Sequence, residues 1–299
     1  MSGLEKHGEA PIAGERFEVT SSAGRVTVYV EGEGAPLLLI HSINAAASAA
    51  EVEPLIDLYR TRRQVFSLDL PGFGLSERSD RIYTPRLMTD AIHSVATTIG
   101  ARNTQPIDAL AVSLSCEFLA RAASEEPALF QTLALVSPTG FSGRRALRDA
   151  PGTTRAKPWL YALLRGPGSR RGAAIFRQLT RPKVIRYFLK RTWGSARIDE
   201  RLWEVDIRMA RCPGAHYAPL YFLSGGLFSA DIHTVYEQLS MPVWLCHGTR
   251  GDFTDYTQTS LVEPRKNWSI TVFDSGALPY FEVPREFAES YDEFLRTHR

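Results

Sequence analysis

The residues best suited to chemistry lie around Ser113, at the end of a short apolar run. Positions 107–112 read Ile-Asp-Ala-Leu-Ala-Val, and Ala111 and Ser115 stand two positions before and after the serine. Small residues at these two positions permit a tight strand-to-helix turn that lifts the serine hydroxyl clear of the strand. Such a hydroxyl can attack a carbonyl carbon, while the backbone N–H of Leu114 stabilises the oxyanion that forms. A strand–helix junction rich in small residues, without chemistry, is the alternative interpretation.

The pattern of apolar residues predicts that a mostly parallel β-sheet flanked by helices positions this serine. Short apolar runs alternate with amphipathic stretches along the chain, which is typical of an α/β fold. A Ser-Ser-Ala-Gly turn predicts a hairpin between strands at 17–20 and 26–30. Further strands are expected at 37–41, 64–69, 107–112, 133–136, 243–247 and 269–273, and helices at 84–100, from 115 to about 126 and from about 284 onward.

The alternation of strands and helices is interrupted between residues 141 and 235, a helical stretch broken by Gly and Pro. Between Phe141 and His233 there are 18 Lys and Arg residues against six acids, a difference of +12. Because the net charge of the chain is +2, the remainder carries about −10. We therefore predict a tail at 1–14, a core at 15–140 and 236–299, and an inserted basic helical segment at 141–235.

Three motifs, taken in this order, resemble those of the α/β-hydrolase superfamily. Residues 37–44 read Leu-Leu-Leu-Ile-His-Ser-Ile-Asn, where an oxyanion loop should follow a strand, and residues 69–76 read Asp-Leu-Pro-Gly-Phe-Gly-Leu-Ser after the next strand. The turn at Ser113 resembles the nucleophile elbow of the superfamily, although Ala111 and Ser115 replace the usual glycines. The resemblance extends from about Val26 to the C-terminus, apart from the insertion.

This resemblance implies an α/β-hydrolase fold with a cap domain at 141–235 over the active site. It assigns the oxyanion hole to the N–H groups of Leu114 and of Ile43 or Asn44. The catalytic acid of the family follows the strand at 243–247, where Asp252 is the preferred candidate and Asp255 the second. Either carboxylate could instead form a solvated Asx-turn, which is a common role for aspartate.

The histidine of the family belongs in a loop before the final helix, and this sequence has Ala277 in that place. The surrounding residues, Asp-Ser-Gly-Ala-Leu-Pro-Tyr-Phe at 274–281, otherwise match. A serine hydroxyl is a weak nucleophile until a neighbouring base takes its proton, so this departure puts ordinary hydrolysis in doubt.

Another histidine could supply the missing base. Of the seven, His216 in the predicted cap could reach down over Ser113, although exposure on a surface loop is the simpler interpretation. The others are interpreted as scaffold or tail residues, and Cys116 as a packed thiol. The expected substrate pocket consists of His41, Ser42, Ser137, Trp159, Phe222 and Leu278. Three scattered cysteines, without a CxxC pair, favour neither a disulfide framework nor a metal site.

The predicted cap interleaves cations with aromatic residues, as in Lys-Pro-Trp-Leu-Tyr at 157–161 and Lys-Val-Ile-Arg-Tyr-Phe-Leu-Lys-Arg at 183–191. One interpretation is a docking face for an anionic membrane surface, an acidic carrier protein or a phosphorylated substrate. Amphipathic lid helices whose arginines face solvent are the other. No motif of a nucleic-acid-binding module is present, so nucleic acid is not an expected partner.

The sequence thus predicts an enzyme acting on an ester, thioester or related acyl compound through Ser113, an oxyanion hole and a non-standard triad, with no cofactor. Two alternatives stay open: a lyase or isomerase that uses only the oxyanion hole, and a non-catalytic lipid- or protein-binding protein. Residues 1–14 contain no apolar segment like that of a secretory signal. We therefore expect a cytoplasmic protein, with peripheral membrane association as an open alternative.

Overall fold

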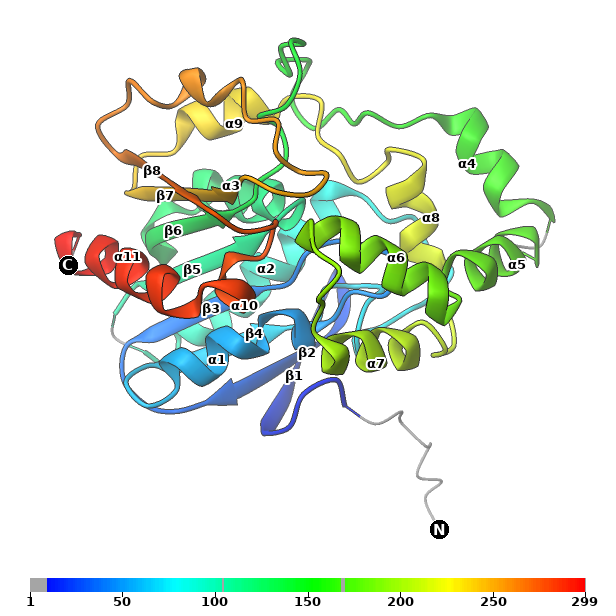
Figure 1. Ribbon diagram of the computed structural model, residues 1–299, viewed down its shortest axis with the longest axis horizontal. Coiled ribbons are helices and arrows are strands. Elements are labelled where there is room, and N and C mark those ends of the chain that lie inside the picture. The colour runs from blue at the N-terminus through cyan, green and yellow to red at the C-terminus, as the bar shows by residue number, and fades with distance from the viewer. Residues whose placement is uncertain (1–9, 104, 168–169, 299) are drawn as a thin grey trace.

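The computed structural model describes residues 10–103, 105–167 and 170–298, so most of the predicted tail lies outside it. The described residues form an eight-stranded sheet in the order β1-β2-β4-β3-β5-β6-β7-β8 (Figure 1). Strands β1 (Glu15–Ser21) and β2 (Gly24–Glu31) form the predicted antiparallel hairpin, and β2 pairs antiparallel with β4 (Gln64–Leu68). The other pairs are parallel and involve β3 (Pro36–Ile40), β5 (Ile107–Val112), β6 (Phe130–Val136), β7 (Val243–Gly248) and β8 (Trp268–Phe273). The predicted α/β-hydrolase fold is confirmed.

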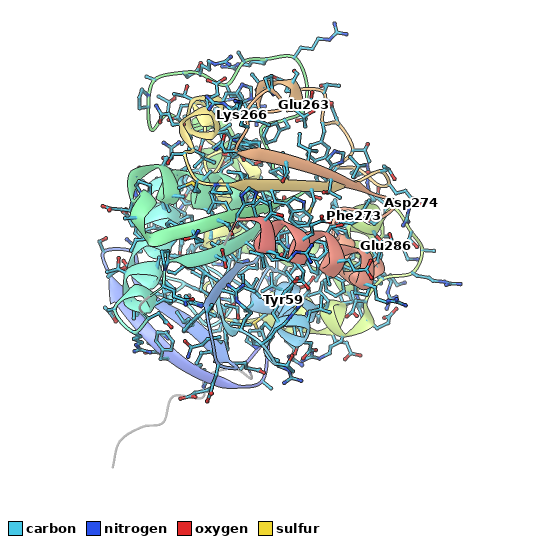
Figure 2. The ribbon with its side chains drawn as sticks, turned by 90° about the vertical axis from the view of Figure 1, so that its left-hand side faces the viewer. Tyr59, Glu263, Lys266, Phe273, Asp274 and Glu286 are labelled. Atoms are coloured by element: carbon cyan, nitrogen blue, oxygen red, sulfur yellow. The ribbon has the colours of Figure 1, made fainter. Side chains whose placement is uncertain are left out.

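Helices cover both faces of the sheet (Figure 1). One face carries α2 (Pro85–Gly100), α3 (Ser115–Glu125) and α9 (Ile232–Gln238), and the other carries α1 (Glu53–Tyr59), α10 (Pro279–Glu282) and α11 (Pro284–Thr297). Figure 2 shows α11 between Tyr59 of α1 and Phe273 of β8. Helix α1 and the short α10 are elements that the sequence pattern did not predict.

Local sequence explains why these elements form where they do. Helix α2 begins after Thr84, whose side chain accepts a hydrogen bond from the Leu87 N–H, and Pro85 occupies its first position. Strand β5 is buried along its whole length because helices cover both faces of the sheet. Its one carboxylate, Asp108, is satisfied by the buried guanidinium of Arg63 at 2.5 Å and by the Thr132 hydroxyl at 2.6 Å.

The insertion between β6 and β7 contains the helices α4 (Pro158–Arg165), α5 (Arg170–Leu179), α6 (Pro182–Trp193), α7 (Glu200–Met209) and α8 (Tyr217–Leu223). They lie beside the carboxyl ends of the parallel strands (Figure 1). A Cβ added at Gly72, after β4, would collide with Ala218 of α8, and one at Gly276, after β8, with the Trp193 backbone of α6. In the part of the chain that the structure describes, no helix is long and apolar enough to cross a membrane.

Candidate functional site

The turn at Ser113 has the strained geometry of a nucleophile elbow. Ser113 adopts a left-handed backbone with φ 56°, between the end of β5 and the start of α3. For a residue with a Cβ this conformation costs about 1–2 kcal/mol, so the surrounding structure must hold it. The Ser113 N–H donates to the carbonyl of Val136 at 2.8 Å, which ties the turn to β6. Among the described residues, none forms a hydrogen bond with the Ser113 hydroxyl, which is half-buried.

Two backbone N–H groups beside this turn are available to a ligand. Leu114 and Ile43 are both almost completely buried, and neither N–H has a hydrogen-bond acceptor within the described ranges. Buried N–H groups without an acceptor are rare in proteins, because leaving one unpaired is costly. Asn44 is half-buried, and its side-chain oxygen accepts from the Ala46 N–H at 2.7 Å, which fixes the loop after β3. Within the described structure, Leu114 and Ile43 are therefore candidate N–H donors to a ligand.

Ser42 lies at the strand end next to the elbow. The sheet register pairs Ile40 of β3 with Ala111 of β5, so Ser42 and Ser113 each follow neighbouring strand residues by two positions. The Ser42 N–H and hydroxyl both donate to the carboxylate of Glu51, at 2.5 and 2.8 Å. Ser42 is therefore held by Glu51 and does not present a free hydroxyl.

Glu51 belongs to a buried pair of carboxyl groups that sequence reasoning missed. Burial raises the pKa of Glu51 above its ordinary value, against the lowering effect of the Ser42 hydrogen bonds. Burial, and then the nearby Glu51, raises the pKa of Asp206 on α7 well above its ordinary value. Asp206 follows Leu202 and Val205 and precedes Met209 on the buried stripe of α7, and an acid in an apolar stripe is a signal the sequence carried. The pair lies where α7 of the insertion packs against the short helix Ala49–Val52.

The loop at Ala277 is covered by the end of α6. The Ala277 N–H donates to the Thr192 carbonyl at 2.9 Å, and the Ala277 carbonyl accepts from the Ser137 hydroxyl at 2.7 Å. Ala277 is only 6% exposed. The position at which the family places its histidine is thus filled by backbone contacts with the insertion.

Each described histidine contacts residues other than Ser113. Both ring nitrogens of His41 are occupied, one beside the Ser42 carbonyl and the other accepting from the Leu70 N–H, and those of His233 contact Leu147 and Gly140. This saturation does not support a place for His41 in a substrate pocket. The remaining histidines are placed by other contacts: His93 by Ala122, His216 by Phe176 and Tyr217, His247 by Gly248 and Tyr256, and His298 by Phe294, while His7 lies outside the described residues.

His216, the predicted alternative base, lies in the segment before α8. Burial lowers the pKa of His216, which disfavours the protonated imidazole and makes it a weaker base. Its ring packs on Tyr217, with centroids 4.0 Å apart, and no hydrogen bond links it to Ser113 in the described structure. The contacts of His216 are therefore those of a packed aromatic ring.

The candidate acids lie on the surface. Asp252 is exposed and pairs with the Arg191 guanidinium of α6, and its N–H donates to the Arg191 carbonyl. Asp255 is exposed and accepts from the Gly143 N–H and the Thr257 hydroxyl. None of these contacts leads to Ser113 or to a histidine, so the geometry does not support Asp252 as a triad acid.

The residues predicted to line a substrate pocket differ in their exposure and contacts. Ser137, which also has a left-handed backbone (φ 48°), is buried against Ala277, and Leu278 is buried beside it. Phe222 is partly buried and stacks on Phe228 at 5.5 Å. Trp159 is largely exposed on α4, a position that does not agree with a pocket wall. Among the described residues, no group of His, Cys, Asp and Glu side chains is arranged to hold a metal ion.

One cavity lies on the seam between core and insertion. It has a volume of about 190 Å³ and is lined by Glu53, Asp57 and Phe281 of the core and by Arg201 and Val205 of α7. The buried Glu51 and Asp206 belong to the elements that flank it, the short helix Ala49–Val52 and α7.

Comparison with known proteins identifies the family of this chain and solved structures with a similar fold. Residues 37–290 match the model of the alpha/beta hydrolase family. Curated protein sequences yield no match. The chain is similar to a thermophilic esterase from Thermogutta terrifontis (TM-score 0.71, 19% identity, covering 96% of this chain and 100% of that one). It is also similar to a serine hydrolase involved in carbazole degradation (TM-score 0.74, 16% identity, 95% and 100%). A meta-cleavage product hydrolase from Pseudomonas fluorescens gives a TM-score of 0.71 at 14% identity (95% and 98%). At such identities the solved structures support the fold alone, but the match over residues 37–290 covers most of the sequence, and this chain belongs to the alpha/beta hydrolase family.

Proposed function

We propose that this protein acts on an ester, thioester or related acyl compound, with Ser113 as nucleophile and the N–H groups of Leu114 and Ile43 as its oxyanion hole. The observation that carries the proposal is the left-handed Ser113 turn, with φ 56°, beside two buried residues whose N–H groups have no described acceptor. Strain and unpaired buried donors are retained in a fold where a ligand or transition state uses them.

The reaction begins with attack of the Ser113 oxygen on the acyl carbonyl. The negative charge then develops on the carbonyl oxygen, where fixed N–H donors are worth more than water because they need no reorientation. The serine proton passes to an acceptor other than an imidazole from the final loop, because that position is Ala277. His216, a water molecule and the substrate itself are the candidate acceptors.

A lyase or isomerase reaction is the second candidate. It needs the oxyanion hole to stabilise an enolate but forms no acyl-enzyme, so it does not require a base for Ser113. The unbonded Ser113 hydroxyl and the Ala277 substitution favour it.

Labelling with a fluorophosphonate probe tests the proposal. We expect the full chain to be labelled, Ser113→Ala to abolish labelling, and Ser137→Ala to retain it. Ser137 is a matched control because it also has a positive φ at a strand end, but its hydroxyl is held by the Ala277 carbonyl. Labelling that survives Ser113→Ala would contradict the proposal. An unlabelled chain whose Ser113→Ala variant still exchanges the α-proton of a thioester would support the second candidate instead.

A further inference from the structure

All the charged residues of the segment 150–198 are cations. The segment contains twelve Lys and Arg residues and not one Asp or Glu. Three of these cations pair with acids elsewhere in the chain: Arg165 with Asp80, Arg186 with Glu200, and Arg191 with Asp252. The other nine have no ion pair with any described acid. Five of these nine are exposed on α5 and α6, which therefore present a positive surface that described acids do not pair: Arg170, Arg171, Arg177, Lys183 and Lys190.

Helix α4 exposes apolar residues that a helix normally buries. Its sequence is Pro-Trp-Leu-Tyr-Ala-Leu-Leu-Arg, and none of its eight residues is buried. Trp159 is 67% exposed and Leu163 is 52% exposed. An amphipathic helix of a globular domain turns its apolar stripe toward the core, so this helix is incompletely covered by the protein. Lys157 precedes the helix and Arg165 is its last residue.

Helix α6 repeats the pattern of exposed rings among cations. Its inner stripe, Ile185, Leu189 and Trp193, is buried against the core. Its outer side carries Tyr187 and Phe188, which are 52% and 53% exposed, together with the exposed Lys183 and Lys190. Aromatic rings that project between cations match the region of a bilayer where headgroups meet acyl chains.

We propose that α4, α5 and α6 form a surface that binds an anionic lipid bilayer. Trp159 and Leu163 insert among the headgroups, while the unpaired cations of α5 and α6 contact lipid phosphates. A bilayer suits this surface better than an acidic protein, because α4 lies at the periphery of the molecule (Figure 1) and its Trp159 and Leu163 side chains are exposed.

The surface is connected to the strand ends that carry Ser113. Tyr161 of α4 packs on Tyr221 of α8 with centroids 4.2 Å apart, and Ala218 of α8 lies against Gly72 in the turn after β4. A bilayer bound at α4 would therefore lie one helix away from that turn. Binding itself is independent of the Ser113 chemistry, and Ser113→Ala is expected to bind vesicles like the unaltered chain.

Vesicle sedimentation of the full chain tests the proposal, with phosphatidylcholine vesicles compared to vesicles that also contain phosphatidylglycerol. We expect binding to the anionic vesicles only, weakening as salt rises above about 0.1 M, where the Debye length falls below about 10 Å. The double variants Trp159→Ala/Leu163→Ala and Lys183→Glu/Lys190→Glu should each lose tenfold or more in affinity. Because all four side chains are exposed, circular dichroism should show both variants folded.

Two matched controls lie outside the surface. Val272→Ala removes an apolar side chain of β8 that is 54% exposed, and Lys266→Glu reverses a cation in the loop before β8 (Figure 2). Both should bind anionic vesicles like the unaltered chain. The proposal is overturned if the chain ignores anionic vesicles, if salt does not weaken binding, or if neither double variant differs from its control. Capture of the chain by polyglutamate without vesicle binding would likewise overturn it in favour of an acidic protein partner.

Discussion

Glu117, in the first turn of the elbow helix α3, offers a quantitative test of the site's electrostatics. Its carboxylate is fully buried, accepting from the Thr139 hydroxyl at 2.5 Å and from the Ser229 N–H at 2.8 Å. Burial raises its pKa from 4.5 to about 7, and those two hydrogen bonds and the charge of Arg155 only partly oppose the rise. The carboxyl thus links α3 to the segments after β6 and before α9. Ionising it in this buried position lowers the free energy of unfolding, by an amount that depends on pH.

The sign and size of that effect follow from linkage. Because the pKa is higher in the folded than in the unfolded chain, stability is fully present below about pH 4.5 and is lost as pH rises through about 7. Each pKa unit corresponds to about 1.4 kcal/mol, so the ionised carboxyl lowers the free energy of unfolding by about 3 kcal/mol at pH 9. Glu117→Gln mimics the neutral acid: its oxygen can accept from Ser229, and its amide can donate to the Thr139 hydroxyl.

Urea denaturation at pH 5 and pH 9 measures the effect as a difference between the two proteins. We expect Glu117→Gln to match the unaltered chain near pH 5 and to exceed its free energy of unfolding by about 3 kcal/mol at pH 9. Glu117→Ala serves as the control, because it leaves Ser229 and Thr139 unpaired and should be destabilised at both pH values. An identical pH dependence for Glu117→Gln and the unaltered chain would refute the reasoning.

Three other substitutions test separate parts of the structure. The free energy of unfolding of Ser113→Gly, measured with urea, should exceed that of Ser113→Ala by up to about 1 kcal/mol, because only glycine relieves the left-handed strain. Equal free energies of unfolding would count against strain at the elbow. In Asp206→Asn, Tm should fall less steeply with rising pH than in the unaltered chain, because the raised pKa of Asp206 makes its ionised form destabilising in the folded protein. An unchanged slope of Tm against pH would contradict this. Asp108→Ala leaves the buried Arg63 unpaired and should cost about 3–5 kcal/mol in urea denaturation, whereas Asp149→Ala, at an exposed pair, should cost less than about 1.

The sequence predicted those parts of the fold that depend on local patterns. Strand β5 occupies the expected residues 107–112, and the hairpin, α2 and α3 begin and end within a few residues of their predicted bounds. Helix α1 was missed because its seven residues show no extended periodicity. The first residues of α9 fall inside the predicted insertion, yet this helix packs against α3 in the core (Figure 1).

The candidate site was predictable only where it depends on backbone geometry. Small residues on both sides of Ser113 predicted the turn, since steric limits there act between near neighbours. The partners of Asp252 and Glu51 were not predictable, because each is set by where the insertion packs on the core. Arg191 reaches Asp252 only once α6 lies over the segment after β7. Asp206 approaches Glu51 only once α7 packs beside the segment that follows β3.

The packing of α6 also bears on what the alanine at position 277 means. Ala277 donates to Thr192 and accepts from Ser137, while Trp193 packs on Phe281 at 5.2 Å and Arg250 pairs with Glu282 at 2.7 Å. These contacts hold the final loop against the insertion. The two hydrogen bonds of Ala277 use its backbone atoms, and the residue is only 6% exposed. An imidazole at position 277 would have to be accommodated in this buried seam between the final loop and α6, so the chemistry available to Ser113 is tied to the way the insertion lies on the sheet.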